Sequence, residues 1–163
     1  TEIYTLSLHD ALPILPDLAL VSFGADLPAA PLPAGARFHH RPPQAALASI
    51  YSACDAWLYA SRAEGFGLPL LEAMACRTPV VATPAGAAPE LLEGGGGALV
   101  PHADPEAMAG ALLDIVRLPE PRWRALSDAA WATASGYTWE DAADRFEAAL
   151  RAAVERGAPG KTR

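Results

Sequence analysis

The sequence predicts an α/β fold, a parallel sheet with helices on both faces, and two observations support this prediction. Short apolar runs typical of buried parallel strands, such as 17–23 and 79–83, alternate with segments whose apolar residues recur at helical spacing. Clusters of glycine and proline separate the two kinds of segment. Because parallel strands need a long crossover connection, which a helix usually supplies, this alternation predicts one parallel sheet.

Each element follows from its own local pattern. Apolar and β-branched runs predict strands, proline-rich stretches predict loops, and apolar positions three and four residues apart predict helices. The first part of the chain is expected to form a strand at 17–23, a loop at 25–36, a strand at 37–40 and a helix from Gln44. A strand at 56–59, a helix at 69–76 and strands at 79–83 and 98–100 are expected to follow, and then helices at 105–117, 121–134 and from Thr138. Pro69 suits the first position of its helix, and Asp104 is the expected N-cap of another.

The composition limits the class of protein. The chain has 163 residues, 52% hydrophobic and 19% charged, which is enough for one sizeable core and excludes a disordered polymer. The net charge of -7 argues against a nucleic-acid partner, because binding to phosphates needs clustered cations. No apolar run is long enough to span a membrane. Two cysteines, Cys54 and Cys76, are too few for a disulfide framework, so we expect buried thiols and a cytoplasmic protein.

The first residues differ in composition from the rest of the chain. The segment 1–14 reads TEIYTLSLHDALPI and holds two of the four isoleucines, Ile3 and Ile14. It resembles the in-frame translation of a sequencing-library adapter, and we interpret it as an artefactual segment that does not belong to the fold. We therefore expect an incomplete domain at 15–156, truncated at its N-terminal side, and a disordered tail at 157–163.

The segment 61–83, SRAEGFGLPLLEAMACRTPVVAT, holds the residues that indicate function. A predicted strand leads to Gly65-Phe66-Gly67, where two glycines let the backbone turn sharply and approach a ligand. Pro69 then begins a helix whose first amides have no partners within the helix and lie at the positive end of its dipole. A phosphate group is the ligand that such a helix start favours.

Two carboxylates flank this predicted phosphate site. Glu64 precedes the glycines, and Glu72 lies eight residues later, in about the first turn of the helix. Neither favours a diphosphate, since like charges repel, but each can accept hydrogen bonds from the vicinal hydroxyls of a sugar. A phosphate site with a polyol site on each side describes a nucleotide sugar. For Glu72 taken alone, an acid favoured by the helix dipole is an equally good interpretation.

Glu64 and Glu72, with the intervening GFGLPLL, resemble the E-x7-E motif of retaining glycosyltransferases of the GT-B fold, in the group 1, family 4-like class. The later stretches TPVVATPAGAAPELL and GYTWEDAADRFEAAL are also similar to that family. The resemblance implies the Rossmann-like C-terminal half of a GT-B fold. It also implies that Glu64, the catalytic candidate, lies beside the donor sugar, that the amides from Gly65 to Leu68 meet the sugar and diphosphate, and that Glu72 binds the ribose diol.

The same resemblance implies how a parent enzyme works. A hexose such as mannose or glucose passes from a nucleotide-diphosphate donor to an acceptor with retention of configuration, and no cofactor or metal ion is expected. An arginine and a lysine that neutralise the phosphates, and an N-terminal domain that binds the acceptor, are expected to precede this chain, so we expect the chain alone to be inactive. The parent is expected in the cytoplasm or peripheral to the inner face of the membrane.

Two other interpretations of function stay open. A non-catalytic nucleotide-sugar-binding module fits the same residues, since all of them bind the donor and none transfers a proton. A nucleotide-sugar epimerase of the GT-B fold needs a histidine or a second acid near Glu64, which the sequence does not show. Arg41, after the strand at 37–40, is a candidate for a contact to the nucleobase, and the preceding histidines are interpreted as solvated or structural.

Overall fold

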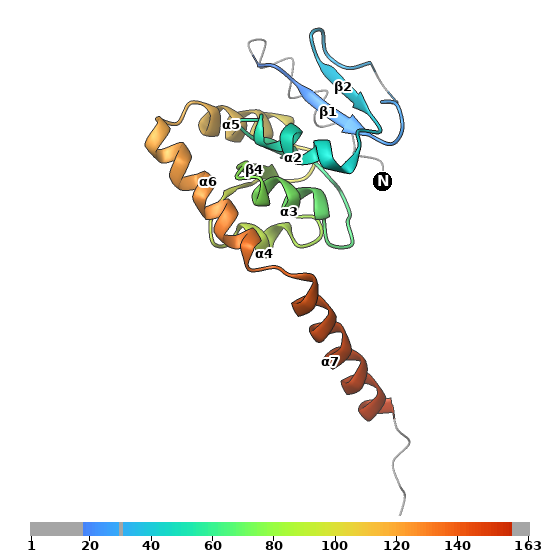
Figure 1. Ribbon diagram of the computed structural model, residues 1–163. Helices are drawn as coiled ribbons and strands as arrows, with labels where there is room; N and C mark the ends of the chain where they lie inside the picture. The colour runs from blue at the N-terminus through green and yellow to red at the C-terminus, as the bar shows by residue number, and fades with distance from the viewer. Residues whose placement is uncertain (1–17, 30, 158–163) are drawn as a thin grey trace, which may run out of the picture.

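The structure of the chain is a computed structural model that describes residues 18–29 and 31–157 (Figure 1). The described elements are, in order, β1 (Val21–Gly24), β2 (Arg37–His40), α2 (Gln44–Ser52), β3 (Trp57–Tyr59), α3 (Leu68–Ala75), β4 (Val80–Ala82), α4 (Ala88–Leu92), β5 (Gly97–Leu99), α5 (Pro105–Val116), α6 (Glu120–Ser135) and α7 (Trp139–Gly157). The segment 1–14 and most of the tail expected at 157–163 lie outside the described residues.

The described strands are all parallel, as the sequence predicts, but they form two sheets. β1 pairs with β2, and β4 lies between β3 and β5 in a second sheet of three strands. The two sheets meet through side chains, since Phe23 of β1 stacks on Trp57 of β3 with ring centroids 5.5 Å apart. No ladder of backbone hydrogen bonds joins β1 to β3 in the described chain, and for this reason the single expected sheet is divided in two.

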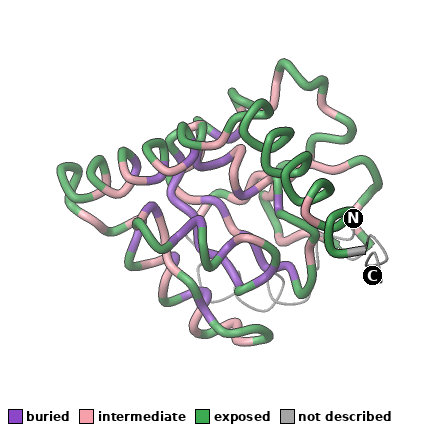
Figure 2. Tube along the Cα trace, turned by 90° about the horizontal axis from the view of Figure 1, so that it is seen from below, coloured by how far each residue is buried: buried purple, intermediate pink, exposed green. Residues whose placement is uncertain are grey.

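Helices cover both faces of the three-stranded sheet, because successive residues of a strand point to opposite faces. Val80 and Ala82 of β4 belong to a core cluster formed with α2, α3 and α4, whereas Val81 between them belongs to a second cluster formed with α5. α6 adds Ala130 to the first cluster and packs Leu126 against the second. Figure 2 shows the buried residues concentrated in the centre of this body.

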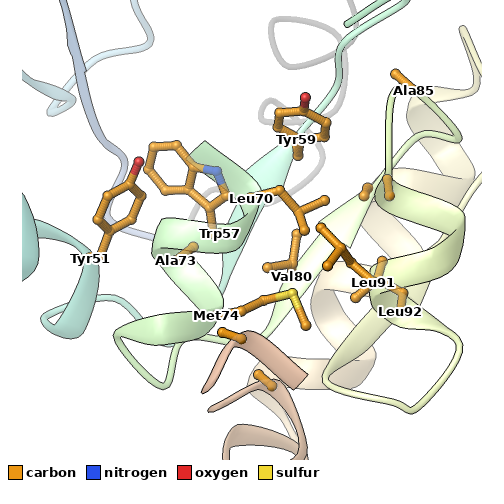
Figure 3. Close-up of a cluster of buried hydrophobic side chains, with 14 residues drawn as sticks. Tyr51, Trp57, Tyr59, Leu70, Ala73, Met74, Val80, Ala85, Leu91 and Leu92 are labelled. Atoms are coloured by element: carbon orange, nitrogen blue, oxygen red, sulfur yellow. The ribbon is translucent and has the colours of Figure 1, made fainter. Parts of the chain in front are cut away.

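Tyr51 on α2 connects the two sheets at one end of the first cluster. Its ring centroid lies 4.7 Å from that of Trp57 and 5.5 Å from that of Phe23. Figure 3 shows Tyr51 and Trp57 next to Ala73 of α3, with Leu70 in the same cluster. Tyr51 is only 1% exposed, so this aromatic packing fixes α2 against both β1 and β3.

The helices begin close to the expected positions, with small differences. α3 begins at Leu68, so Pro69 is its second residue rather than its first, and Gly67 is its N-cap. The Asp104 carboxylate accepts a 2.8 Å hydrogen bond from the Ala107 amide, which confirms the expected N-cap of α5. The sequence pattern does not predict α4, because a five-residue helix has too few positions for an apolar period to be recognised.

α7 projects away from the body and is exposed along almost its whole length (Figure 1). Its apolar face holds Trp139, Phe146, Leu150 and Val154, of which Trp139 is 78% and Phe146 is 66% exposed. Apolar residues therefore share one face of this helix, as their spacing predicts, but that face is not buried in the described part of the chain. No described helix has the length and apolar character needed to cross a membrane.

The two cysteines are half-buried, not fully buried as the sequence interpretation expects. Each lies just after a helix, Cys54 after α2 and Cys76 after α3, and both line a surface hollow of about 270 Å³ that also includes Trp123 and Arg77. Burial raises the pKa of both thiols, and the neighbouring Asp55 raises that of Cys54 further. A helix end leaves its side chains partly open to solvent, and residue type alone does not predict this position.

Candidate functional site

The loop that follows β3 turns sharply at Gly67, immediately before α3. Gly67 has a φ of +100°, a left-handed conformation that residues with a side chain rarely adopt. A Cβ at this position would also lie 2.4 Å from the hydroxyl oxygen of Tyr59, whose side chain is buried beneath the loop. Backbone conformation and lack of space therefore both require glycine here.

A second loop, which follows β4, is hydrogen-bonded to the first. The Ala87 amide donates a 2.8 Å hydrogen bond to the carbonyl oxygen of Phe66. Gly86, one residue earlier, has a φ of +57°, and a Cβ there would lie 2.5 Å from the same carbonyl oxygen. The two loops thus meet at the carboxyl ends of adjacent parallel strands, which is the edge at which α/β sheets bind their ligands.

Consecutive backbone amides at this edge, from Gly65 to Leu68, donate no hydrogen bond to any described residue. By contrast, the amides of Leu70 and Leu71, which come next along α3, donate to the carbonyl oxygen of Gly67 at 3.0 and 3.4 Å. Free amides at the start of α3 lie at the positive end of the helix dipole. This arrangement favours a phosphate or another anion as the ligand.

Glu64 is held within the first loop by a hydroxyl group. The Ser61 hydroxyl donates a 2.8 Å hydrogen bond to Oε1 of Glu64, and the Thr83 hydroxyl in turn donates to the carbonyl oxygen of Ser61. Oε2 of Glu64 accepts no hydrogen bond from the part of the chain that the structure describes. The half-buried Glu64 therefore keeps this oxygen available for a ligand. Burial of the Tyr59 phenol and, to a smaller extent, the negative charge of the nearby Glu64 raise the pKa of Tyr59 to about 12.

Glu72 lies in the second turn of α3, not in the first turn as the spacing predicted, because the helix already begins at Leu68. The Tyr51 hydroxyl donates a 2.9 Å hydrogen bond to Oε2 of Glu72, and Oε1 accepts none from the described residues. A favourable interaction with the helix dipole is weak beyond the first turn, so it does not account well for an acid here. Both acids thus have the same arrangement: a hydroxyl bonds one carboxylate oxygen and the other oxygen is available.

Two further residues of the predicted site make contacts of their own. Arg41 follows β2 with a φ of +49°, and its Nε donates a 2.8 Å hydrogen bond to the carbonyl oxygen of Ala25. Among the described residues, no hydrogen bond or ion pair joins Arg41 to the loop of Glu64, so its role at the nucleobase stays a prediction. The Phe66 ring packs against that of Tyr137, with centroids 5.9 Å apart, while its backbone supplies one of the free amides.

Three residues that shape this edge are missing from the sequence prediction. Helical spacing places Tyr51 among the apolar positions of its helix, and this pattern gives no signal for its hydroxyl. Ser61 belongs to the predicted segment, but nothing in its spacing assigns it to Glu64. Gly86 has a recognisable signal, because a glycine shortly after a buried strand is typical of a turn with positive φ.

Solved structures with the same fold include sucrose-phosphate synthase from Thermosynechococcus elongatus, with a TM-score of 0.76 and 26% sequence identity over 93% of this chain and 42% of that chain. HepE from Anabaena, in complex with UDP and glucose, has a TM-score of 0.65 and 26% identity over 80% of this chain and 39% of that chain. These neighbours are glycosyltransferases of the GT-B fold, and this chain has the Rossmann-like fold of their C-terminal half.

Sequence comparison gives the family. Residues 9–117 match the family described as Glycosyl transferases group 1, and this chain belongs to that family. The D-inositol 3-phosphate glycosyltransferase of Segniliparus rotundus is 39% identical over 117 residues, which are 71% of this chain and 26% of that protein. The protein of the same name from Mycobacterium avium is 38% identical over 122 residues, 73% of this chain and 29% of that protein. The chain thus spans between a quarter and a third of the length of these relatives.

Proposed function

We propose that this chain binds the nucleotide-diphosphate sugar donor of a retaining glycosyltransferase, for transfer of a hexose such as glucose or mannose to an acceptor. The observation that supports this most directly is the edge formed by the loops after β3 and β4. Free amides from Gly65 to Leu68 lie there in sequence between two acids, Glu64 and Glu72, each with an available carboxylate oxygen. Membership of the group 1 glycosyltransferases supports donor binding as the role of this edge.

The chemistry of these groups divides the donor among them. Amide donors at a helix start stabilise a diphosphate, whereas carboxylates repel it. The acids are suited instead to sugar hydroxyls, and a hydrogen bond to a charged group contributes about 1.5–3 kcal/mol. We assign the hexose to Glu64, the catalytic candidate, and the ribose diol to Glu72.

In the proposed mechanism the acceptor hydroxyl attacks the anomeric carbon from the face that the diphosphate leaves, so the configuration is retained. The loop amides are in place before the reaction, so they stabilise the charge that develops on the leaving diphosphate without reorganising. No side chain of this chain acts as a nucleophile in the proposal, and no metal ion or cofactor takes part. A domain outside this chain binds the acceptor, so the proposal assigns donor binding, and not transfer, to the chain alone, in a cytoplasmic parent.

A nucleotide-sugar epimerase of the same fold is the competing enzyme class. It needs a proton-transferring histidine or second acid next to Glu64. The Ser61 hydroxyl donates a hydrogen bond to the Glu64 carboxylate and the Tyr59 phenol lies near it, whereas no histidine or acid is hydrogen-bonded to it within the described residues. This favours glycosyl transfer over epimerisation. A non-catalytic module would bind the same donor, so binding alone does not distinguish it from an enzyme. An assay of sugar transfer by the longer parent protein distinguishes the two.

Isothermal titration calorimetry of the full chain with UDP-glucose, GDP-mannose and ADP-glucose tests the proposal. UDP-glucose is the first choice, because the neighbour HepE is known in complex with UDP and glucose. We expect Glu64→Gln to weaken UDP-glucose about tenfold without changing the affinity for UDP, because UDP lacks the hexose. Glu72→Gln is expected to weaken both ligands about tenfold, because both contain the ribose.

Glu90→Gln is the matched control for these two variants. Glu90 also accepts a hydrogen bond from a tyrosine hydroxyl, that of Tyr137 at 3.0 Å, but it lies on α4. Its substitution is expected to leave both affinities unchanged. The proposal is wrong if none of the three donors binds, or if Glu90→Gln weakens UDP-glucose as much as Glu64→Gln and Glu72→Gln do.

A further inference from the structure

Tyr51 and Glu72 come from different helices and meet through one hydrogen bond. The phenol oxygen of Tyr51, on α2, lies 2.9 Å from Oε2 of Glu72, on α3. Tyr51 is 1% exposed, so bulk water does not replace this bond, whereas Glu72 is half-buried. A buried phenol without a partner costs free energy, which favours the paired state. The bond therefore links an immobile side chain to one that solvent, and thus a ligand, can reach.

The position of Tyr51 is fixed through its ring and through its backbone. The ring packs edge-on against Phe23 at 5.5 Å and against Trp57 at 4.7 Å between centroids. The carbonyl oxygen accepts hydrogen bonds from the Thr78 hydroxyl at 2.8 Å and from the Cys54 amide at 3.0 Å. Because ring and backbone are both held, the phenol oxygen has one position, and so does the carboxylate oxygen bonded to it.

The direction of the hydrogen bond is determined as well. An ionised carboxylate only accepts, so Tyr51 donates to Glu72. Burial, and then the charge of Glu72, raise the pKa of Tyr51 and keep its phenol protonated at physiological pH. The carboxylate is thereby held in one orientation, in which Oε1 has no partner among the described residues.

We propose that Tyr51 is a positioning residue for ribose recognition: it orients Glu72 so that the free carboxylate oxygen meets the ribose diol of the nucleotide. This inference rests on the proposed function, because it requires Glu72 to bind the ribose. A carboxylate that is already oriented loses less rotational freedom on binding than a mobile one, so its contact contributes more to affinity. The consequence is selectivity for a ribonucleotide over a nucleotide without the 2′ and 3′ hydroxyls.

The test compares the dissociation constants of UDP and 2′,3′-dideoxy-UDP for the full chain, and their ratio measures ribose selectivity. Tyr51→Phe keeps the ring and its packing and removes only the hydroxyl. We expect this variant to lower the selectivity about five- to tenfold, with the affinity for dideoxy-UDP unchanged. A merely structural role for Tyr51 would weaken both ligands equally, and the unchanged ratio would overturn the proposal. If the chain prefers GDP or ADP, the same pair of ligands is used with that base.

Two further variants sharpen the comparison. Tyr137→Phe is the matched control, because the Tyr137 hydroxyl also donates to a glutamate, Glu90, at 3.0 Å; we expect it to leave the selectivity unchanged. In a Glu72→Gln background, Tyr51→Phe is expected to cause no further loss, because the charged contact that it orients is already gone. If the double variant instead loses ribose selectivity by the product of the two single losses, Tyr51 does not act through Glu72.

Circular dichroism and the affinity for dideoxy-UDP report whether Tyr51→Phe is folded. If it is not, Glu72→Asp replaces it as the test, because this change leaves the packing of Tyr51 intact, keeps the charge and withdraws the carboxylate from the phenol. The proposal then requires a lower selectivity, and native selectivity overturns it. A native chain that binds none of UDP, GDP and ADP refutes the proposed function and this inference with it. Native ribose selectivity that survives Tyr51→Phe refutes the role of Tyr51 alone.

Discussion

Replacement of Gly67 by alanine is the most direct test of the loop before α3. Two costs add at this position. An alanine in a left-handed conformation costs about 1–2 kcal/mol relative to glycine, and a φ as unusual as +100° moves the cost toward about 3 kcal/mol. The new Cβ also lies 2.4 Å from the hydroxyl oxygen of Tyr59, which is only 5% exposed, so a buried ring must shift to admit it. We therefore expect a loss of about 3 kcal/mol in the free energy of unfolding.

Thermal denaturation followed by circular dichroism measures this loss. For a chain of this size, about 3 kcal/mol corresponds to a fall of about 6–12 °C in Tm. Displacement of the loop amides is also expected to weaken UDP-glucose more than about tenfold in calorimetry, because a misplaced donor loses its hydrogen bond to the phosphate. The two readouts should change together, since one backbone turn determines both.

Gly110→Ala provides the matched control, because it makes the same chemical change in the middle of α5. A Cβ at Gly110 meets nothing within 4 Å, and the residue is exposed in a helix where alanine is preferred. We expect Gly110→Ala to stabilise the chain by about 0.5–1 kcal/mol and to leave donor affinity unchanged. A Gly67→Ala chain that melts at the native temperature and binds UDP-glucose with native affinity would refute the reasoning.

Three other predictions concern stability and reactivity. Since the pKa of Tyr59 is raised from 10.0 to about 12, the folded state favours its neutral form. That stabilisation is complete below pH 10 and is lost as the pH rises from 10 to 12, which urea denaturation across this range will show. If absorbance shows that this phenol ionises near pH 10 in the folded chain, the prediction is contradicted. Asp104→Ala removes the N-cap bond to Ala107 and is expected to cost about 1 kcal/mol, measured by denaturation; no loss would mean that the cap does not contribute. Because burial raises the pKa of Cys54 and Cys76, both thiols should react with iodoacetamide at pH 8 more slowly in the folded chain than in urea. Mass spectrometry measures the two rates, and equal rates would count against the burial of these thiols.

The sequence predicts most of the backbone arrangement and the location of the candidate site. β2 occupies 37–40, as the proline-rich loops on either side of this segment predict, and the N-cap at Asp104 is confirmed by its hydrogen bond. The spacing between Glu64 and Glu72 places both acids around the start of α3, although it puts Glu72 one turn too early. These predictions succeed because backbone period, capping and glycine turns depend on residues close together along the chain.

Only the tertiary structure decides which groups hold the acids and how the sheet is divided. Tyr51 reaches Glu72 across 21 residues, and the carbonyl oxygen of Phe66 meets the amide of Ala87 from the next loop. The contact between β1 and β3 is made by the rings of Phe23 and Trp57 and not by backbone pairing. Such contacts depend on how distant segments pack, which the pattern of neighbouring residues does not encode in a readable form. The sequence therefore locates the acids, and the fold determines their orientation.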